Sequence, residues 1–320
     1  MKKIFFFLLA VLLLLTLGGC GVEYPESGIL LEENPTESSV EQEEDSAGYD
    51  FLFISDTARA STGDYSRLKS MMDFAAGTLP EIDFILHGGD VVNPTEDGSE
   101  WTAYLEAMSA VSDIPTYVSW GEKDDKLLTS HYTLPENGPA DLLHHFYSFS
   151  YENAHFIFLD SAYMGLQRED YVNWLKGDIA NSGREWNILV CHYPLYPAAD
   201  LDNDIERANA QRKLWDSLLN ELGIDLVLSG HQHLYMRSTP AVNGEAAAEG
   251  PIYIQTNSGG IYTTEVAEYP YIAQSYTTNS NFCHFNISKN LLTLNVYDAG
   301  GSLVDSTSIA KESDTLPLTE

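Results

Sequence analysis

The stretch Ser229-Gly230-His231-Gln232-His233 decides the fold assignment of this chain. It follows an apolar run at 224–228, Ile-Asp-Leu-Val-Leu, which predicts a buried strand. Gly230 then begins a turn at the carboxyl end of that strand, where open α/β sheets gather their ligands. Alternate residues of an extended segment point the same way, so His231 and His233 can reach one site. Neutral imidazole is the commonest metal ligand among side chains, and two unrelated surface histidines are the alternative.

Four further apolar strands end in the same way. Each is about four to six residues long, an ordinary strand length, and is followed directly by a carboxylate or an imidazole. The residues at those ends are Asp56, Asp90, Glu122 and His192. A single aspartate after a strand is usually a turn or cap residue, but a succession of such ends predicts one shared site. Oxygen and imidazole donors together suit Mn, Fe or Zn rather than a thiolate site.

Strands and helices alternate over the first two-thirds of the chain, and the last third is rich in strands. This order favours two packed sheets with helices outside them. A long irregular insertion is expected over 124–145, and Asp64 is expected to cap the first helix. The expected helices span 64–78, 100–111, 168–179 and 206–222, and the expected strands span 50–55, 82–86, 115–119, 146–151, 155–159, 186–191, 224–228, 252–255, 282–287, 291–297 and 303–309.

The beginning of the chain reads as a targeting segment. Lys2 and Lys3 precede an apolar run from Ile4 to Leu17, which is shorter than a membrane span of about 20 residues. The Leu-Gly-Gly-Cys sequence that follows resembles a bacterial lipoprotein cleavage box. We therefore expect a signal peptide over 1–19, lipid on Cys20 and an extracytoplasmic chain anchored to the cell membrane. An ordinary cleaved signal or an uncleaved anchor is the alternative.

The remaining organisation follows from composition. Residues 20–49 are acidic and poor in apolar groups, which predicts a disordered tether. One α/β domain is expected over 50–311, followed by a flexible tail over 312–320. The formal net charge of −32 argues against binding to nucleic acid, and no protein partner is predicted. Cys191 and Cys283 are expected to be two separate buried thiols, with a disulfide as the alternative.

The ordered set of strand ends resembles the calcineurin-like metallophosphoesterases, and most of all the branch with the purple acid phosphatases and their bacterial relatives. The resemblance covers most of residues 50–310 and implies a four-layer α/β/β/α sandwich of two mixed sheets. The stretches that carry it are Ile54-Ser55-Asp56, Gly88-Gly89-Asp90-Val91-Val92-Asn93, Gly121-Glu122-Lys123-Asp124, Val190-Cys191-His192-Tyr193-Pro194-Leu195 and Gly230-His231-Gln232-His233.

The resemblance also implies a site with two divalent or trivalent metal ions, Mn, Fe or Zn. Asp90 would bridge them, with Asp56 and His233 on the first ion and the Asn93 amide as a weak further donor. The second ion would be held by three residues at other strand ends, His192, His231 and Glu122.

The implied reaction is hydrolysis of phosphate esters, monoesters foremost, by a hydroxide between the metals. The substrate is expected to be a small phosphorylated molecule. Lys123, Asp124 and His231 are the expected catalytic residues. Lys123 and Arg237 are the expected substrate-binding residues, although an ion pair with a local acid is an equal alternative for Arg237.

Three positions depart from the family pattern. Glu122-Lys123 stands where the family has Asn-His, Ala58 stands where histidine is common, and Asn93 stands at the tyrosine of purple phosphatases. We therefore expect no tyrosinate-to-iron colour. A weakened or single-metal enzyme, an inactive surface binding protein and a metal-stabilised structural or adhesion protein are the alternatives.

Overall fold

The computed structural model describes residues 48–311, apart from 60–63, 94, 165–167 and 261–264. By their contacts the residues of the chain divide into two units, 1–44 and 45–320, and all described residues belong to the second. The predicted signal peptide, Cys20, nearly all of the tether and the tail lie outside the described residues. Within the described part, no helix is both long and apolar enough to cross a membrane.

The first sheet has six strands in the order β15-β14-β13-β1-β2-β3. Strands β1, β2 and β3 are mutually parallel, whereas β13 runs antiparallel to β1 and begins an antiparallel meander through β14 and β15. The strands are β1 Tyr49–Ile54, β2 Phe84–His87, β3 Thr116–Val118, β13 Asn281–Ser288, β14 Leu291–Asp298 and β15 Leu303–Ala310.

The second sheet has seven strands in the order β12-β8-β11-β7-β6-β5-β4. Its centre, β5, β6, β7 and β11, is parallel, and antiparallel strands flank it on both sides. A separate two-stranded ribbon, β9 Ala241–Val242 with β10 Glu245–Ala246, lies outside it. The strands are β4 Phe146–Tyr151, β5 Ala154–Leu159, β6 Trp186–Val190, β7 Leu226–Ser229, β8 Tyr235–Ser238, β11 Ile252–Gln255 and β12 Ile272–Tyr276.

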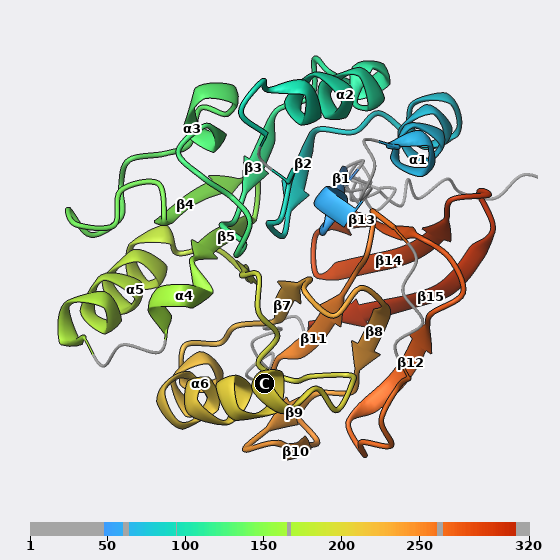
Figure 1. Ribbon diagram of the computed structural model, residues 1–320. Helices are drawn as coiled ribbons and strands as arrows, with labels where there is room; N and C mark the ends of the chain where they lie inside the picture. Colours follow the sequence, from blue (N-terminus) through green and yellow to red (C-terminus); the bar gives the residue numbers. More distant parts are fainter. Residues whose placement is uncertain (1–47, 60–63, 94, 165–167, 261–264, 312–320) are drawn as a thin grey trace, which may run out of the picture. The chain divides into compact units, whose positions relative to one another are not determined.

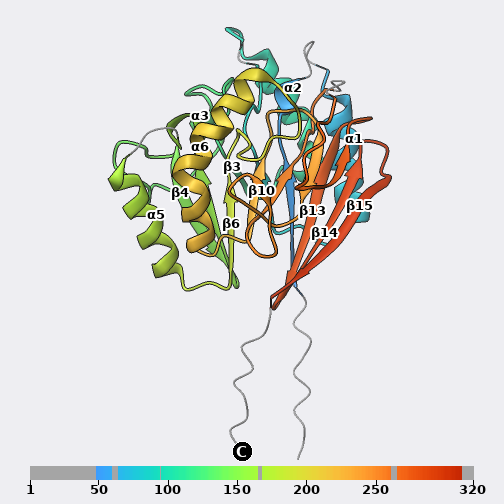
Figure 2. The same ribbon diagram turned by 90° about the horizontal axis from the view of Figure 1, so that it is seen from below.

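The two sheets face each other, with helices on the outer side of each (Figures 1 and 2). Helices α1 and α2 cover the first sheet, and α5 and α6 cover the second, which confirms the predicted four-layer α/β/β/α sandwich of two mixed sheets. The helices are α1 Ser66–Thr78, α2 Ser99–Ala107, α3 Leu128–His131, α4 Ser161–Met164, α5 Glu169–Ser182 and α6 Asp202–Glu221, with 3₁₀ turns η1 Thr57–Arg59 and η2 Ser109–Val111.

The layers follow from the two-residue period of the strands. In β6, Ile188 and Val190 belong to the core between the sheets, whereas Leu189 belongs to the core under α5 and α6. The inter-sheet core is rich in aromatic rings, and the Phe51 ring lies 5.3 Å from the ring of Phe156 across the two sheets. Both faces of these strands are therefore buried, as the continuous apolar runs of the sequence predict.

The structure differs from the sequence-based expectations at several element boundaries. Strands β8, β9, β10 and β12 and the short helices α3 and α4 were not expected, and α6 begins at Asp202 rather than 206. Helix α1 begins at Ser66 with Tyr65 as its N-cap residue, so the expected cap at Asp64 is wrong, although the backbone N–H of Ser66 donates a 3.0 Å hydrogen bond to Oδ1 of Asp64. Cys191 and Cys283 are both buried and free, which confirms the expectation of separate thiols.

Candidate metal centre

The predicted ligands meet because every one of them follows a parallel strand. Parallel strands end at the same edge of a sheet, so β1 and β2 deliver two aspartates to one edge and β6 and β7 deliver three histidines to another. Two hydrogen bonds join these edges. The backbone N–H of His231 donates to Oδ2 of Asp56 at 2.8 Å, and Nδ1 of His192 donates to the carbonyl of Gly88 at 2.9 Å.

Three of these side chains form a buried donor group. One ligand atom from each of Asp56, Asp90 and His192 lies within 4.8 Å of the other two, and all three residues are fully buried. Because His192 donates through Nδ1 to a carbonyl, Nε2 is its remaining ring nitrogen, and it lies 3.6 Å from Oδ1 of Asp90. This Nε2 makes no hydrogen bond in the described part of the chain. A buried, unsatisfied imidazole nitrogen beside two carboxylates fits a metal ion.

The two histidines of the Gly-His-Gln-His stretch approach different members of this group. Nε2 of His233 lies 3.3 Å from Oδ1 of Asp56, as expected for the first metal position. His231 places Nδ1 3.8 Å from Oε2 of Glu122, while its Nε2 lies 2.9 Å from Oδ1 of Asp204. His233 therefore lies beside Asp56 and His231 beside Glu122, and the division of the donors into two metal sets stays a prediction.

Four of the predicted ligands have a strained backbone. Few non-glycine residues adopt a positive φ, and such strain clusters at functional sites. The φ angles are +57° at Asp56, +55° at Asp90, +70° at His231 and +56° at His233. Each residue turns the chain sharply where a strand ends, so the strain places its side chain over the sheet edge.

Glycines keep these turns close together. A Cβ atom on Gly230 would overlap Oγ of Ser55 and Oδ2 of Asp56, and one on Gly121 would overlap the backbone N of Asp90. Neither Gly230 nor Gly121 has a positive φ. Glycine is therefore required at these positions by the lack of space for a Cβ atom and not by the backbone conformation. Gly89, directly before Asp90, differs from them because its φ is +91°.

Asp124 organises the loops around the donor group. Its Oδ2 accepts the N–H groups of Asp90 and Gly121, both at 2.8 Å, and its Oδ1 accepts that of Val91 at 2.9 Å. These three bonds occupy both carboxylate oxygens. Asp124 therefore positions the loops that carry Asp90 and Glu122, and its role as a catalytic residue stays a prediction.

Lys123 and Glu122 lie at the outer side of the donor group. The Nζ of Lys123 contacts Oδ2 of Asp90, and its backbone N–H donates to Oδ1 of the same carboxylate at 2.9 Å. Glu122 accepts a 2.7 Å hydrogen bond from the hydroxyl of Tyr193. The guanidinium of Arg207 stacks 3.6 Å above the Tyr193 ring. Lys123 thus stands beside these carboxylates, whereas Arg207 lies over the tyrosine that holds Glu122.

The electrostatics of the centre favour charged groups despite burial. Burial acts to raise the pKa of Asp56, but the hydrogen bond from His233 and the charge of His192 outweigh it and hold the pKa below its ordinary value. Burial acts to lower the pKa of His192, and the carboxylates of Asp90 and Asp56 outweigh it, so that the pKa is raised. Burial raises the pKa of Asp124 to about 6. The carboxylates therefore create a strong demand for positive charge.

Two predicted residues have other partners. Arg237 pairs with Asp305, with Nε 2.7 Å from Oδ2 and Nη2 3.2 Å from Oδ1, which is the alternative that the sequence left open. Arg237 thus joins β8 to β15, and the prediction that it binds substrate is corrected to a structural role. The amide nitrogen of Asn93 donates to the carbonyl of Ala58, which leaves its role as a metal donor a prediction.

Three contributors were missed from the sequence. Asp204 holds His231, Tyr193 holds Glu122, and the hydroxyl of Ser161 accepts the backbone N–H groups of His192 and Tyr193 at 3.0 and 2.8 Å. The pKa of Asp204 is lowered because the hydrogen bond from His231 outweighs burial. No local pattern marks Asp204 or Ser161, whereas the position of Tyr193 directly after a ligand histidine was a usable signal.

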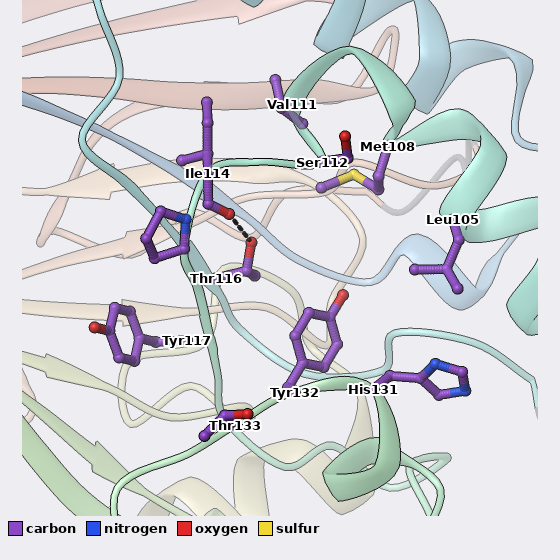
Figure 3. A pocket seen from close by; sticks show the side chains of 11 residues that line it. Leu105, Met108, Val111, Ser112, Ile114, Thr116, Tyr117, His131, Tyr132 and Thr133 are labelled. Carbon is purple, nitrogen blue, oxygen red and sulfur yellow. Dashed lines mark hydrogen bonds between the residues drawn. The ribbon is translucent and has the colours of Figure 1, made fainter.

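A cavity of about 400 Å³ lies away from this centre, between η2, the start of β3 and α3 (Figure 3). Its wall is mostly apolar and aromatic. Side chains that face it include Leu105, Met108, Ile114, Tyr117 and Tyr132. None of the predicted metal ligands lines it, so its existence does not bear on the metal centre.

Comparisons with known proteins agree with this geometry. Purple acid phosphatase 15 of Arabidopsis thaliana is 29% identical over 175 residues, which are 50% of this chain and 32% of that protein. Human acid phosphatase type 7 is 27% identical over 212 residues, 56% of this chain and 48% of that protein. The chain therefore spans less than half the length of these relatives.

Solved structures share the fold. Purple acid phosphatase PPD1 from yellow lupin superposes with a TM-score of 0.70 at 16% identity, covering 83% of this chain and 54% of that one. GAP50, described as the anchor in the inner membrane complex of Plasmodium, has a TM-score of 0.63 at 17% identity, covering 84% and 90%.

The family model of the calcineurin-like phosphoesterases matches residues 49–235, from β1 to the start of β8. Every predicted metal ligand lies inside that range. Phosphoesterases of the purple acid phosphatase kind use two metal ions, and the buried aspartate and histidine donors fit that use. The chain belongs to the calcineurin-like phosphoesterase family.

Proposed function

We propose that this chain is a metal-dependent phosphoesterase that hydrolyses phosphate esters, with small phosphomonoesters as its main substrates. The observation that carries the proposal is the buried group of Asp56, Asp90 and His192, in which an unsatisfied imidazole nitrogen faces two carboxylates. The family match and the acid phosphatase names of the relatives support the same reaction class.

The residues divide into two ligand sets around Asp90. Asp56 and His233 would hold one ion with it, and Glu122, His192 and His231 would hold the other. When bound, the ions would activate a water molecule and neutralise the phosphoryl oxygens. A chain with a net charge of −32 needs such local cations before it can accept a phosphorylated substrate.

The surrounding residues keep these donors in place. Asp124 fixes the loops after β2 and β3 through three backbone hydrogen bonds, and Ser161 fixes the loop after β6 through two. Lys123 presents positive charge at the outer side of Asp90, and Arg207 lies over the ring of Tyr193, whose hydroxyl holds Glu122. The arrangement would orient an anionic substrate while the ligand positions stay fixed.

The test is hydrolysis of an aryl phosphomonoester by the full chain in the presence of Mn²⁺, Fe²⁺ or Zn²⁺. Metal-dependent turnover is expected, and Asp90→Asn is expected to lower kcat by about 10³-fold or more, because both ligand sets lose their shared carboxylate. Asp113→Asn, the same change at an exposed position before β3, is the matched control. Absence of turnover with every metal, in protein that binds metal, would refute the monoesterase proposal.

A second candidate is a phosphate-binding surface protein with little turnover. The specific observation in its favour is the contact of the Lys123 ammonium with Asp90, at the position where the family has histidine. The fold alone does not decide between the two, because one fold hosts many functions. Calorimetry with inorganic phosphate separates them: binding without hydrolysis of any phosphate ester would favour this second candidate.

We further propose that the chain is a lipid-anchored extracytoplasmic protein. The support is the Lys2-Lys3 start, the short apolar run and the Leu-Gly-Gly-Cys sequence that ends at Cys20. Expression in a bacterium with labelled palmitate tests it. Label in the membrane fraction that disappears in Cys20→Ala is expected, and equal labelling of both proteins would contradict the proposal.

A further inference from the structure

The ammonium of Lys123 lies among the donors that the second metal ion would use. Its Nζ contacts Oδ2 of Asp90, and it lies 3.8 Å from Oε1 of Glu122. Asp90 and Glu122 are the two carboxylates of the second ligand set. The backbone N–H of Lys123 also donates to Asp90 at 2.9 Å, so the loop itself holds the lysine at this carboxylate.

Asp90 belongs to both ligand sets, but Asp56, the carboxylate of the first set alone, pairs with no lysine or arginine among the described residues. Asp56 is fully buried and is contacted by Ser55, His233 and the backbone of His231. The Lys123 side chain, by contrast, is 25% exposed and reaches the donor group from the outer side. The two sets therefore differ in what an entering cation must displace.

From this difference we infer that Lys123 is a built-in competitor of the second metal ion, so that the two ions bind one after the other with unequal affinity. The first divalent cation enters at Asp56, Asp90 and His233. The ammonium opposes both ions at the shared Asp90, but the second ion also needs Glu122, which lies beside the ammonium, so its binding requires Lys123 to withdraw. The inference rests on the proposed two-metal site but not on turnover.

The other donors of the second ligand set must also lose their present partners before they can bind an ion. Oε2 of Glu122 holds the hydroxyl of Tyr193 at 2.7 Å, and Nδ1 of His231 lies 3.8 Å from that carboxylate. Glu122 is the exposed member of the set and can rotate toward an ion when Lys123 withdraws. Glu122 carries a negative charge that the family's asparagine lacks. This charge then offsets the positive charge of Lys123, which stays nearby after it withdraws.

The experiment is a Mn²⁺ titration of the full chain by calorimetry, with electron paramagnetic resonance on the same samples to distinguish isolated from coupled ions. The wild-type chain is expected to show two steps whose Kd values differ by about tenfold or more. In Lys123→Met the Kd of the second step is expected to fall by about tenfold or more and that of the first step by less, because the ammonium lies beside both carboxylates of the second set but only one of the first.

Two variants control for loss of charge and of fold. Lys126→Met removes an exposed lysine of the same loop and is expected to leave both steps unchanged. Lys123→Arg keeps the charge and is expected to keep the steps apart. Two equal steps in the wild-type chain, or an unchanged second step in Lys123→Met, would overturn the inference. The titration contains no substrate, so a failed phosphatase assay and a failed competitor model remain distinguishable.

Discussion

The Nε2 atom of His231 lies 2.9 Å from Oδ1 of Asp204, the third residue of helix α6. Asp204 also accepts a 2.9 Å hydrogen bond from the side-chain amide of Gln232 through its other oxygen. A histidine that donates through one ring nitrogen presents the lone pair of the other. Asp204 therefore orients His231 so that Nδ1 faces Glu122 and the second metal position.

Asp204→Asn should weaken metal binding without removing a ligand. The amide cannot accept from His231 and Gln232 with both of its side-chain atoms, so His231 loses its fixed orientation. Loss of such an outer partner typically lowers metal affinity about 10- to 100-fold. Calorimetric titration with Mn²⁺ measures it. Glu206→Gln, an exposed position two residues later in α6, is the control, and an equal loss in both variants would contradict the orienting role.

Gly230→Ala should destabilise the protein because its Cβ would overlap Ser55 and Asp56. Overpacking of this kind costs about 1–3 kcal/mol of the free energy of unfolding. Gly177→Ala is the contrasting change, since nothing lies within 4 Å of its Cβ and it stands inside α5. There a gain of about 0.5–1 kcal/mol is expected. Thermal unfolding measures the melting temperature of both variants. Similar melting temperatures would refute the argument that Gly230 is required by close packing.

Arg237→Gln should lower stability near neutral pH and change the Michaelis constant little. Burial acts to raise the pKa of Asp305, but the hydrogen bonds from Arg237 and Tyr235 outweigh it and lower the pKa below 3.8. A lowered folded-state pKa means that the carboxylate stabilises the fold above pH about 4 and loses this effect as the pH falls.

The expected loss in Arg237→Gln is about 1.5–3 kcal/mol at pH 7, the usual contribution of hydrogen bonds to charged groups. The difference from wild type should be smaller at pH 3 than at pH 7, because a carboxylate with a lowered pKa contributes less to stability once the pH falls below its ordinary value. Denaturant unfolding at both pH values measures it, with the exposed Arg184→Gln as control. A large rise in KM with unchanged stability would instead support the prediction that Arg237 binds the substrate.

Asp124→Asn should disturb both the loops and the metal centre. One amide oxygen cannot replace two carboxylate oxygens that accept three backbone N–H groups. Buried donors left without acceptors cost about 1–3 kcal/mol. Asp125→Asn, next in the chain, removes a carboxylate that accepts only the amide of Leu127 among the side-chain bonds described, so a smaller loss is expected. Urea unfolding compares the two, and equal losses would argue against the organising role of Asp124.

The central strands and the ligands at their ends were predictable because both signals are local. Apolar runs such as 186–190 and 226–228 mark strands that are buried on both faces, and each ligand follows its strand within a few residues. Strands β8 and β12 were not predictable in the same way. Their residues are mixed in polarity. Strand β8 forms by pairing with β11 and β12, and β12 forms by pairing with β8.

The partners of the polar side chains were decided by the tertiary structure. His231 and Asp204 are 27 residues apart, Lys123 and Asp90 are 33 apart, and Arg237 and Asp305 are 68 apart. No pattern within a strand or helix specifies such pairs, because they depend on how the ends of separate strands are brought together.

By itself, the sequence determined the alternation of elements, the family resemblance and the set of donors, because strand period and strand termination are properties of neighbouring residues. Only the tertiary structure decided what each donor touches. It brought the ammonium of Lys123 to Asp90, the carboxylate of Asp124 to the backbone of two loops and the guanidinium of Arg237 to Asp305. The physical reason is that a charged group pairs with whatever folding brings within a few ångströms, and that distance is a property of the whole fold.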